Sequence, residues 1–149
     1  MIITTGSGID PAVVGPVPDH VVVFRFVPQQ VIMARSAAAV SHAGSGTVLG
    51  AIAARLPQVC IPIGAHQHIN AAQVDAAGAG IAISPDERTP ERIRAAIDRV
   101  LAEPSYTAAT GRLQDEIQAR PAPSEVLGRL VAMVEGQRGG RIRPGGVDP

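Results

Sequence analysis

Apolar residues fall into short β-branched runs that alternate along the chain with longer segments of helical periodicity. The short runs are bounded by Gly, Pro or polar residues, which is typical of buried strands; they are MIITT, HVVVFRF, SAAAV, QVCIPI and GIAIS. Between them, residues 28–36, 44–56 and 66–78 have the pattern of helices or helical turns. This alternation predicts an α/β fold, a Rossmann-like parallel sheet with helices on its faces.

From residue 89 onward the pattern is helical only. In TPERIRAAIDRVLAE, Thr89 is placed as an N-cap and Pro90 at the first helical position. We expect two further C-terminal helices, at about residues 105–119 and 124–136, and a flexible Gly/Arg/Pro tail at 137–149. The predicted Rossmann-like domain therefore covers residues 1–136.

The charge pattern excludes several kinds of function. The formal net charge is zero and every basic residue is arginine. A basic nucleic-acid surface, Schiff-base catalysis and a lysine-dependent P-loop are therefore not expected. Arginine in place of lysine, with much alanine, is typical of a GC-rich bacterial genome.

The lone cysteine and the apolar runs bear on location. Cys60 cannot form an internal disulfide and is expected to be a small buried hydrophobe. No apolar stretch approaches the roughly 20 residues that span a bilayer, and no export signal is apparent. We therefore expect a cytoplasmic protein without a membrane span.

The turn SHAGSGT at residues 41–47 is the main candidate for a binding site. It lies after a predicted strand, at the sheet edge where open parallel sheets bind ligands. Its glycines allow close approach of a ligand to the backbone, and the next helix presents free N–H groups to an anion. Many such turns bind nothing, so whether this turn is a binding site has to be judged from the surrounding sequence.

The surrounding sequence resembles a known family. FVPQ at 26–29, the stretch SHAGSGTVLGAIAARLPQVCIPIGAHQHINAAQVDAAGAGIAI at 41–83, and TPERIRAAIDRVLAEPSYTAAT at 89–110 carry the likeness. Together they resemble the C-terminal half of GT-B glycosyltransferases that use nucleotide sugars, a group that includes macrolide, glycopeptide and plant secondary-metabolite enzymes. The order and spacing of these motifs make the likeness specific.

The resemblance implies roles for individual residues. It places the uracil or thymine base against Phe26, Val27 and Gln29, and the sugar against His66, Gln67 and Asn70, with Asn70 supporting its loop. It implies a diphosphate site made by a histidine and the start of a helix, which here are His42, Gly44, Ser45, Gly46 and Thr47. It implies no cofactor besides the donor substrate, a UDP- or dTDP-sugar, and no catalytic residue in this chain.

Three positions depart from the family pattern. His66 stands where relatives usually carry a sugar-binding Asp, which leaves the sugar open. Gly50 stands where relatives usually carry a Glu that grips the ribose, and it also weakens a helix by roughly 0.5–1 kcal/mol relative to alanine. Ala43 replaces a usual Gly or Cys, a mild change if its φ is negative.

A zinc site is the rival interpretation of the histidines. His42, His66 and His68 follow successive predicted strands. Residues two apart on a helix point away from each other, and no cysteine or carboxylate completes the set. We therefore expect no metal.

The family's N-terminal acceptor domain and first strand–helix unit have no counterpart in the chain. In the sheet order 3-2-1-4-5-6 that first strand is central. Either the sheet closes up by a register of its own, or another chain supplies the piece. We expect a homodimer or a complex with an acceptor-domain chain.

The sequence leaves three candidate functions. The leading hypothesis is the nucleotide-sugar-binding portion of a hexosyltransferase of natural-product biosynthesis, which acts on a small hydroxyl acceptor; whether the chain alone is an enzyme stays open. The alternatives are a non-catalytic remnant or interaction module of the same fold, and an unrelated mononucleotide-binding domain.

Overall fold

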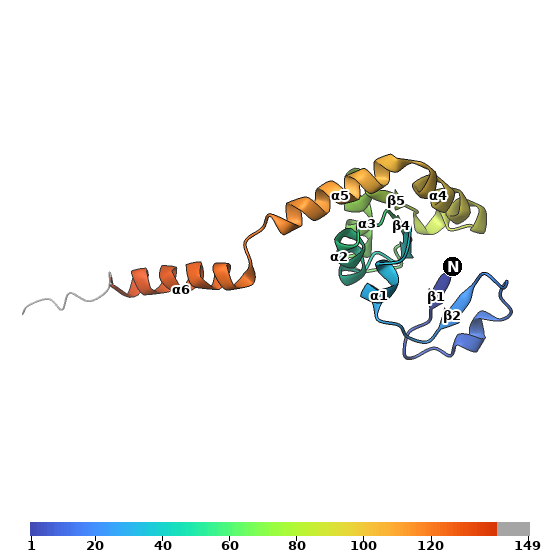
Figure 1. The fold of residues 1–149 in the computed structure, drawn as a ribbon, viewed down its shortest axis with the longest axis horizontal. Coiled ribbons are helices and arrows are strands. Elements are labelled where there is room, and N and C mark those ends of the chain that lie inside the picture. The colour runs from blue at the N-terminus through green and yellow to red at the C-terminus, as the bar shows by residue number, and fades with distance from the viewer. Residues whose placement is uncertain (140–149) are drawn as a thin grey trace, which may run out of the picture. The chain divides into compact units, whose positions relative to one another are not determined.

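The computed structural model describes residues 1–139 and divides the chain into two compact units, residues 1–114 and 115–149. The first unit carries all five strands of the described residues and the first four α-helices (Figure 1). Residues 1–114 of the predicted domain therefore form one unit, while its predicted boundary at 136 stays a prediction. Within the described range, no helix combines the length and apolar character needed to cross a membrane.

The five strands form where the short apolar runs predict them. They are β1 (Ile2–Thr4), β2 (Val22–Phe24), β3 (Ala39–Ser41), β4 (Gln58–Cys60) and β5 (Gly80–Ala82). All pairings are parallel, as the alternation with helices predicts. The described strands form two sheets, one of order β1-β2 and one of order β3-β4-β5.

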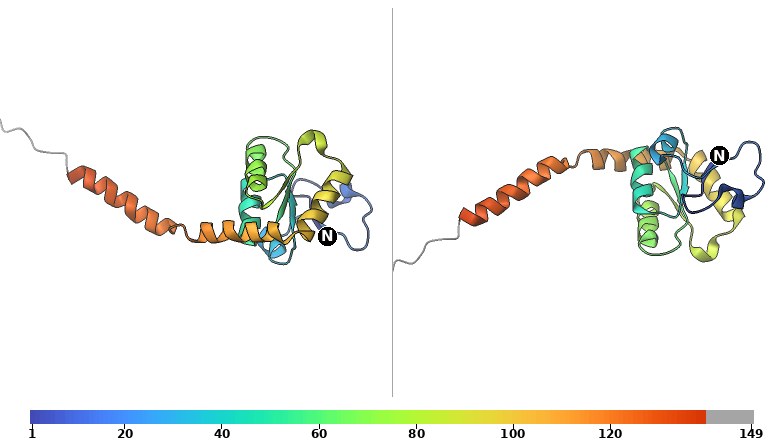
Figure 2. Two further views of the ribbon diagram at one scale, coloured as in Figure 1. Left: turned by 90° about the horizontal axis from the view of Figure 1, so that it is seen from above. Right: turned by 90° about the horizontal axis from the view of Figure 1, so that it is seen from below.

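The helices of the first unit also follow the sequence pattern. They are α1 (Gln29–Met33), α2 (Ser45–Ala53), α3 (Gln67–Ala76), α4 (Pro90–Ala102) and most of α5 (Pro104–Gln118). Two short 3-10 turns, η1 (Pro11–Val14) and η2 (Pro85–Glu87), are additional to the predicted elements. Figure 2 shows α2 and α3 on one face of the three-stranded sheet and α4 on the other.

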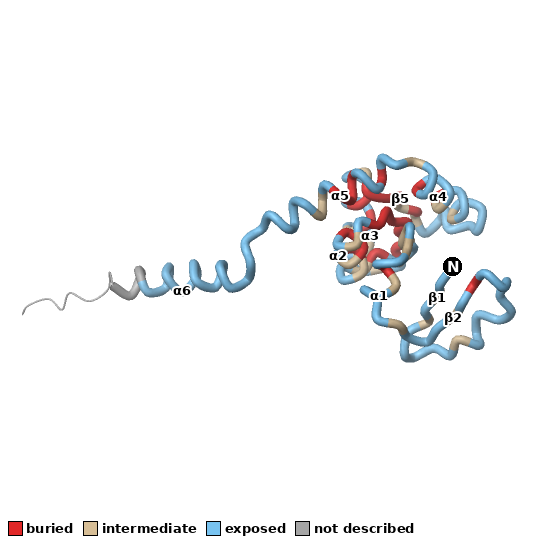
Figure 3. The backbone as a smooth tube through the Cα atoms, in the orientation of Figure 1, coloured by how far each residue is buried: buried red, intermediate tan, exposed pale blue. Residues whose placement is uncertain are grey.

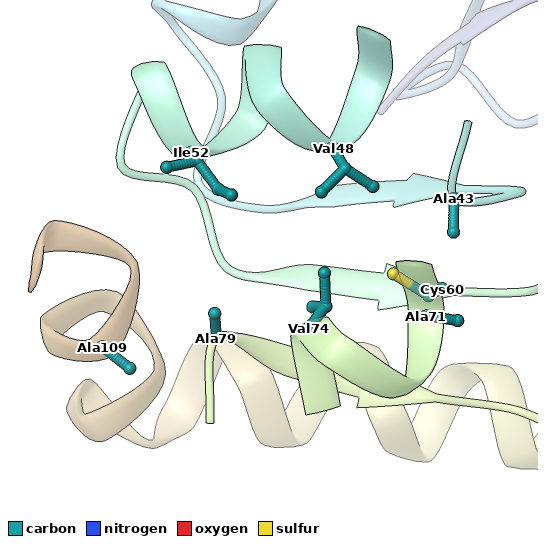
Figure 4. Close-up of a cluster of buried hydrophobic side chains, with 8 residues drawn as sticks. All are labelled: Ala43, Val48, Ile52, Cys60, Ala71, Val74, Ala79 and Ala109. Atoms are coloured by element: carbon teal, nitrogen blue, oxygen red, sulfur yellow. The ribbon is translucent and has the colours of Figure 1, made fainter. Parts of the chain in front are cut away.

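Alternate residues of β4 explain this layered packing. Cys60 belongs to the apolar cluster that includes Val48 and Ile52 of α2 and Val74 of α3 (Figure 4). Its neighbour Val59 belongs to the cluster on the α4 side. Both residues are fully buried, so β4 is the centre of the core, as the buried stretch in Figure 3 shows.

Cys60 is the small buried hydrophobe that the sequence predicts. Burial raises the pKa of its thiol to about 11, and the nearby carboxylate of Asp75 contributes in the same direction. The thiol therefore stays protonated and unreactive at neutral pH.

The start of α4 confirms the predicted capping. The Thr89 hydroxyl accepts a hydrogen bond from the Arg92 backbone N–H at 3.1 Å, and Pro90 is the first helical residue. In the second unit, α6 (Pro123–Gly139) begins close to the predicted residue 124 and continues to 139. The rest of the predicted tail, residues 140–149, lies outside the described residues.

The described strands divide into two sheets between β1 and β3, which are the two strands that the expected order would separate. In that order the family's first strand would lie between the present β1 and β3. The described residues pair β1 with β2 and β3 with β4, and no pairing joins β1 to β3. The sheet therefore has not closed up by a new register, the first of the two alternatives drawn from the sequence.

Candidate functional site

The loop after β3 leads into α2 without a side-chain cap. Gly44 is the N-cap residue, and its carbonyl accepts the first helical bond from the Val48 N–H at 2.9 Å. Among the described residues, no group accepts a hydrogen bond from the backbone N–H of Ser45, Gly46 or Thr47. These three donors, with the positive end of the helix dipole, make a site suited to an anion.

Ala43 has a left-handed backbone, with φ of 62°. The expectation that alanine is a mild change here required a negative φ, and this condition is not met. A non-glycine residue in this region costs roughly 1–2 kcal/mol. Two hydrogen bonds hold the conformation: the Ala43 N–H donates to the Ser41 hydroxyl at 3.1 Å, and the Ala43 carbonyl accepts from Asn70 at 2.9 Å.

His42 lies over Gly44, at the start of α2. A β-carbon built on Gly44 would lie 2.7 Å from Nε2 of His42, which is closer than real contacts allow. The glycine is therefore required for the imidazole to take this position. The side chain of His42 is exposed, so its ring is available to a ligand bound at the helix start.

Asn70 connects α3 to the loop before α2. Its side-chain amide donates to the Ala43 carbonyl at 2.9 Å and to the Ser45 hydroxyl at 3.1 Å. Both bonds go to the predicted diphosphate loop, so the Nδ2 group of Asn70 positions that loop. The predicted role of Asn70 in sugar binding stays a prediction.

The loop before α3 is held by Gln67. Its Oε1 accepts hydrogen bonds from the N–H groups of Ile63 at 2.8 Å and Gly64 at 3.0 Å. Only the Nε2 donor of this amide remains for a sugar hydroxyl, whereas the family resemblance implies that donor and acceptor both face the sugar. His66 precedes the helix, and its side chain is exposed.

The segment after β2 carries the predicted base-binding residues. The ring of Phe26 is 72% exposed, which leaves a face free for stacking, and Val27 is half-buried. The Gln29 side-chain amide donates a hydrogen bond to the Thr47 hydroxyl at a distance of 3.0 Å. The structure thus brings a predicted base-binding residue into contact with a predicted diphosphate-binding residue.

Met33 of α1 occupies the space beside Gly50 of α2. A β-carbon on Gly50 would lie 3.1 Å from the Met33 sulfur. Met33 is 7% exposed and belongs to a small apolar cluster with Ala51 and Leu56. Gly50 is therefore a packing position between two helices, in addition to lacking the carboxylate that the family resemblance implies there.

The site is built almost entirely from neutral groups. Segments 26–29, 41–47 and 63–70 contain no Asp, Glu, Lys or Arg. Within the part of the chain that the structure describes, no three His, Cys, Asp or Glu side chains gather as a metal site would require. The arrangement of the three histidines therefore gives the zinc interpretation no support.

Two residues of the site have no role in the sequence-based assignment. Ser41 accepts a hydrogen bond from the Ala43 N–H. Its position just before the His-x-Gly-x-Gly-Thr pattern was the sequence signal that could have identified it. Met33 contacts Gly50 across two helices, and no local pattern predicts such a contact.

A family model matches residues 1–133 of the chain; its description is "Erythromycin biosynthesis protein CIII-like, C-terminal domain". One similar protein is the 3-alpha-mycarosylerythronolide B desosaminyl transferase of Saccharopolyspora erythraea, 35% identical over 84% of this chain and 30% of the relative. Another is the elloramycin glycosyltransferase of Streptomyces olivaceus, 37% identical over 83% of this chain and 31% of the relative. The chain spans about a third of the length of these relatives.

Solved structures of whole glycosyltransferases contain the same fold. The glycosyltransferase VinC in complex with dTDP matches with a TM-score of 0.78 at 34% identity, over 83% of this chain and 31% of that chain. The spinosyn rhamnosyltransferase complexed with thymidine diphosphate matches with a TM-score of 0.80 at 27% identity, over 87% of this chain and 35% of that chain. The two sheets and their helices thus correspond to the Rossmann-like C-terminal domain of the GT-B fold.

Proposed function

Because the chain belongs to the family of erythromycin biosynthesis protein CIII-like C-terminal domains, we propose that it binds the nucleotide-sugar donor of a glycosyltransferase. The donor is a UDP- or dTDP-linked hexose, and the acceptor is a small molecule with a hydroxyl group. The setting is bacterial natural-product biosynthesis in the cytoplasm.

The uncapped start of α2 is the observation that carries this proposal. Three successive backbone N–H groups, at Ser45, Gly46 and Thr47, have no acceptor among the described residues. A diphosphate supplies acceptor oxygens and negative charge for these donors, and the helix dipole favours it by roughly 0.3–1 kcal/mol per exposed anionic group. Exposed His42 adds an imidazole N–H on the same side.

The loop is organised before any ligand binds. Asn70 holds the Ala43 carbonyl and the Ser45 hydroxyl, and Gln29 holds the Thr47 hydroxyl. Preorganised donors stabilise developing charge without reorganisation at the moment of reaction. In glycosyl transfer the sugar–phosphate bond breaks and the nucleoside diphosphate leaves with increased negative charge. These donors therefore assist catalysis by stabilising the leaving group.

The donor nucleotide fits the remaining features. The exposed ring of Phe26 offers a stacking face for a pyrimidine. Beside the proposed ribose position, Gly50 and Met33 present no carboxylate. The ribose 2′-hydroxyl of UDP then gains no hydrogen bond to a carboxylate. UDP therefore has no advantage from this position over dTDP, which lacks that hydroxyl. Two proteins of similar structure were solved with dTDP.

Transfer requires a base that removes the proton of the acceptor hydroxyl. We assign no catalytic residue to the described residues, because His42 is committed to the diphosphate in this proposal. The acceptor site and the base then belong to an acceptor domain outside the 149 residues of this sequence.

A non-catalytic module of the same fold is the second candidate. Met33 fills the space beside Gly50, and His66 stands in place of the family's sugar-binding carboxylate. If both departures weaken donor binding, the sheet persists as an interaction module. Measured donor affinity separates the two candidates.

Calorimetric titration of the chain with dTDP and UDP tests the proposal. We expect saturable 1:1 binding of at least one nucleotide, and at least tenfold weaker binding by Thr47→Asp, whose carboxylate repels the phosphate. Thr107→Asp on the exposed surface of α5 carries the same charge change and is expected to bind as the unmodified chain does. Absence of binding at millimolar nucleotide would favour the interaction module instead.

A further inference from the structure

A cavity of about 310 Å³ lies between α2, α3 and α5. Its apolar lining comes from all three helices and consists of Val48, Leu49, Ile52, Val74, Ala77 and Leu113. Figure 4 shows Val48 and Ile52 of α2 pointing toward the cluster that Val74 of α3 joins from the other side. Every lining residue belongs to the first compact unit, so this unit forms the whole cavity.

No ionisable side chain lines this cavity. Among the described residues, its polar lining consists of Ser45, Asn70 and Gln73, all of which are neutral. A charged group in the cavity would lose hydration without gaining an ion pair, which is unfavourable. The lining therefore favours a neutral molecule.

The start of α2 supplies hydrogen-bonding groups at the polar end of the cavity. The Ser45 hydroxyl accepts a hydrogen bond from the Asn70 Nδ2 group at 3.1 Å. Within the part of the chain that the structure describes, the Ser45 O–H and the Asn70 Oδ1 atom have no partner. One donor and one acceptor therefore remain, and a ligand hydroxyl can accept from the first and donate to the second.

The volume limits the size of the occupant. An apolar cavity of roughly 150 Å³ holds one benzene molecule. The present cavity has about twice that volume, which is enough for two fused rings. A stable protein–protein interface buries about 800 Å² on each partner, so a cavity of this size suits a small molecule better than a protein segment.

We propose that the cavity between α2, α3 and α5 binds a neutral, mainly apolar ring compound that carries a hydroxyl group. The rings lie against the apolar lining, and the hydroxyl bonds to Ser45 and Asn70. This site is additional to the proposed donor site, and its existence does not depend on nucleotide binding.

Occupancy of the cavity should be coupled to the loop at residues 41–47. Asn70 holds this loop through the Ala43 carbonyl and the Ser45 hydroxyl, and both Asn70 and Ser45 line the cavity. A ligand hydroxyl that bonds to both side chains restricts their motion and stabilises the loop. If the loop also holds a diphosphate, each ligand then increases the affinity for the other by the same factor.

Titration with 2-naphthol tests the proposal in the full 149-residue chain, labelled with ¹⁵N. This probe has two fused rings and one hydroxyl, and it is neutral at neutral pH. We expect saturable amide shifts at Val48, Ile52 and Val74. Amide hydrogen exchange at Ala43 and Val48, whose N–H groups bond to Ser41 and Gly44, should slow at least threefold. The cation of 2-(aminomethyl)naphthalene, which has the same rings, should bind at least tenfold more weakly.

Ala77→Phe fills the cavity from an exposed position at the end of α3. We expect this variant to bind 2-naphthol at least tenfold more weakly. Ala72→Phe makes the same change at an exposed residue of α3 that does not line the cavity, and it should bind within threefold of the unmodified chain. Near-unchanged thermal melting shows that each variant is folded; if Ala77→Phe is not, the shifts and the charged probe on the unmodified chain decide.

Four results would overturn the binding site. The first is no saturable binding at millimolar 2-naphthol, and the second is a set of shifts centred on the exposed ring of Phe26. The third is tighter binding of 2-naphthoate than of 2-naphthol, because the helix start would then be attracting an anion. The fourth is a dimer by light scattering that 2-naphthol dissociates, since a second copy would then be the occupant. Binding that leaves the exchange of Ala43 and Val48 unchanged would overturn the coupling to the loop.

Discussion

The sulfur of Met33 lies 3.1 Å from the position of a β-carbon on Gly50, so α1 and α2 meet at a glycine. The position where the family resemblance implies a ribose-binding carboxylate is here a site of helix packing. Any side chain at residue 50 must displace the end of a side chain that is 7% exposed.

Gly50→Glu should therefore destabilise the chain by about 1–3 kcal/mol through overpacking. Met33→Ala alone should cost about 2–4 kcal/mol because it leaves a cavity. The double variant should cost less than the sum of the two, since each change removes the conflict created by the other. Urea denaturation measures all three free energies of unfolding. Gly46→Glu is the control for overpacking, because a β-carbon at Gly46 meets no atom within 4 Å. If the free-energy changes of the Gly50→Glu and Met33→Ala variants were strictly additive, the contact between the two residues would be contradicted.

Asn70 should matter for the order of the diphosphate loop. Asn70→Asp removes the donor that bonds to the Ala43 carbonyl and the Ser45 hydroxyl. The partly buried carbonyl then lacks its partner, so we expect a loss of about 1–2 kcal/mol and faster amide exchange over residues 43–47. Gln73→Glu makes the same chemical change on an exposed part of α3 and should alter neither quantity. Equal effects of the two variants would show that charge, and not the hydrogen bonds, is responsible.

Ala65→Gly should stabilise the chain. Ala65 has a φ of 52° and an exposed side chain, so glycine removes backbone strain without loss of buried surface. The strain of about 1–2 kcal/mol is partly offset by the greater freedom of glycine in the unfolded chain, which leaves a gain of about 0.5–1 kcal/mol. In exposed Ala72 of α3, the same change to glycine should instead cost about 1 kcal/mol. Chemical denaturation that shows both changes to be destabilising would refute the left-handed assignment.

Cys60 should make stability fall at alkaline pH. The folded pKa of about 11 lies above the ordinary value of 9.0, because burial favours the neutral thiol. The unfolded chain therefore loses this proton first, and stability declines from about pH 9 to pH 11. The decline attributable to this residue is at most about 2–3 kcal/mol.

The Cys60→Ala variant isolates that contribution, because arginine and tyrosine titrations are common to both proteins. Its stability near neutral pH should be lower by the cost of a small cavity, and its decline above about pH 9 should be shallower. Parallel stability curves for the two proteins across the alkaline range, up to about pH 11, would show that the thiol is not shielded in the folded chain.

The sequence predicts the fold well where the signals are local. The short apolar runs give all five described strands, and Thr89 with Pro90 gives the start of α4. The left-handed φ of Ala43 was not predictable, because an alanine carries no sign of positive φ. It depends on two hydrogen bonds, one donated by the Ala43 N–H to Ser41 and one donated by Asn70 to the Ala43 carbonyl, and Asn70 lies 27 residues away.

Within the candidate site, the sequence nominates residues, but it does not predict the hydrogen bonds among them. Gln29 and Thr47 were assigned to different parts of the donor, and the structure joins them by a hydrogen bond. Gln67 was expected to meet a sugar with its whole amide, yet its oxygen holds its own loop. Such contacts depend on how separate loops approach one another at the sheet edge.

The most direct test of the proposed donor site is a titration of the ¹⁵N-labelled chain with dTDP, followed by amide chemical shifts. We expect saturable shifts at Ser45, Gly46 and Thr47, with smaller shifts at Gln29 and near-constant positions for the amides of β5. Unchanged amides at residues 45–47 in millimolar dTDP, or shifts confined to other parts of the chain, would contradict the claim that the start of α2 holds the donor diphosphate.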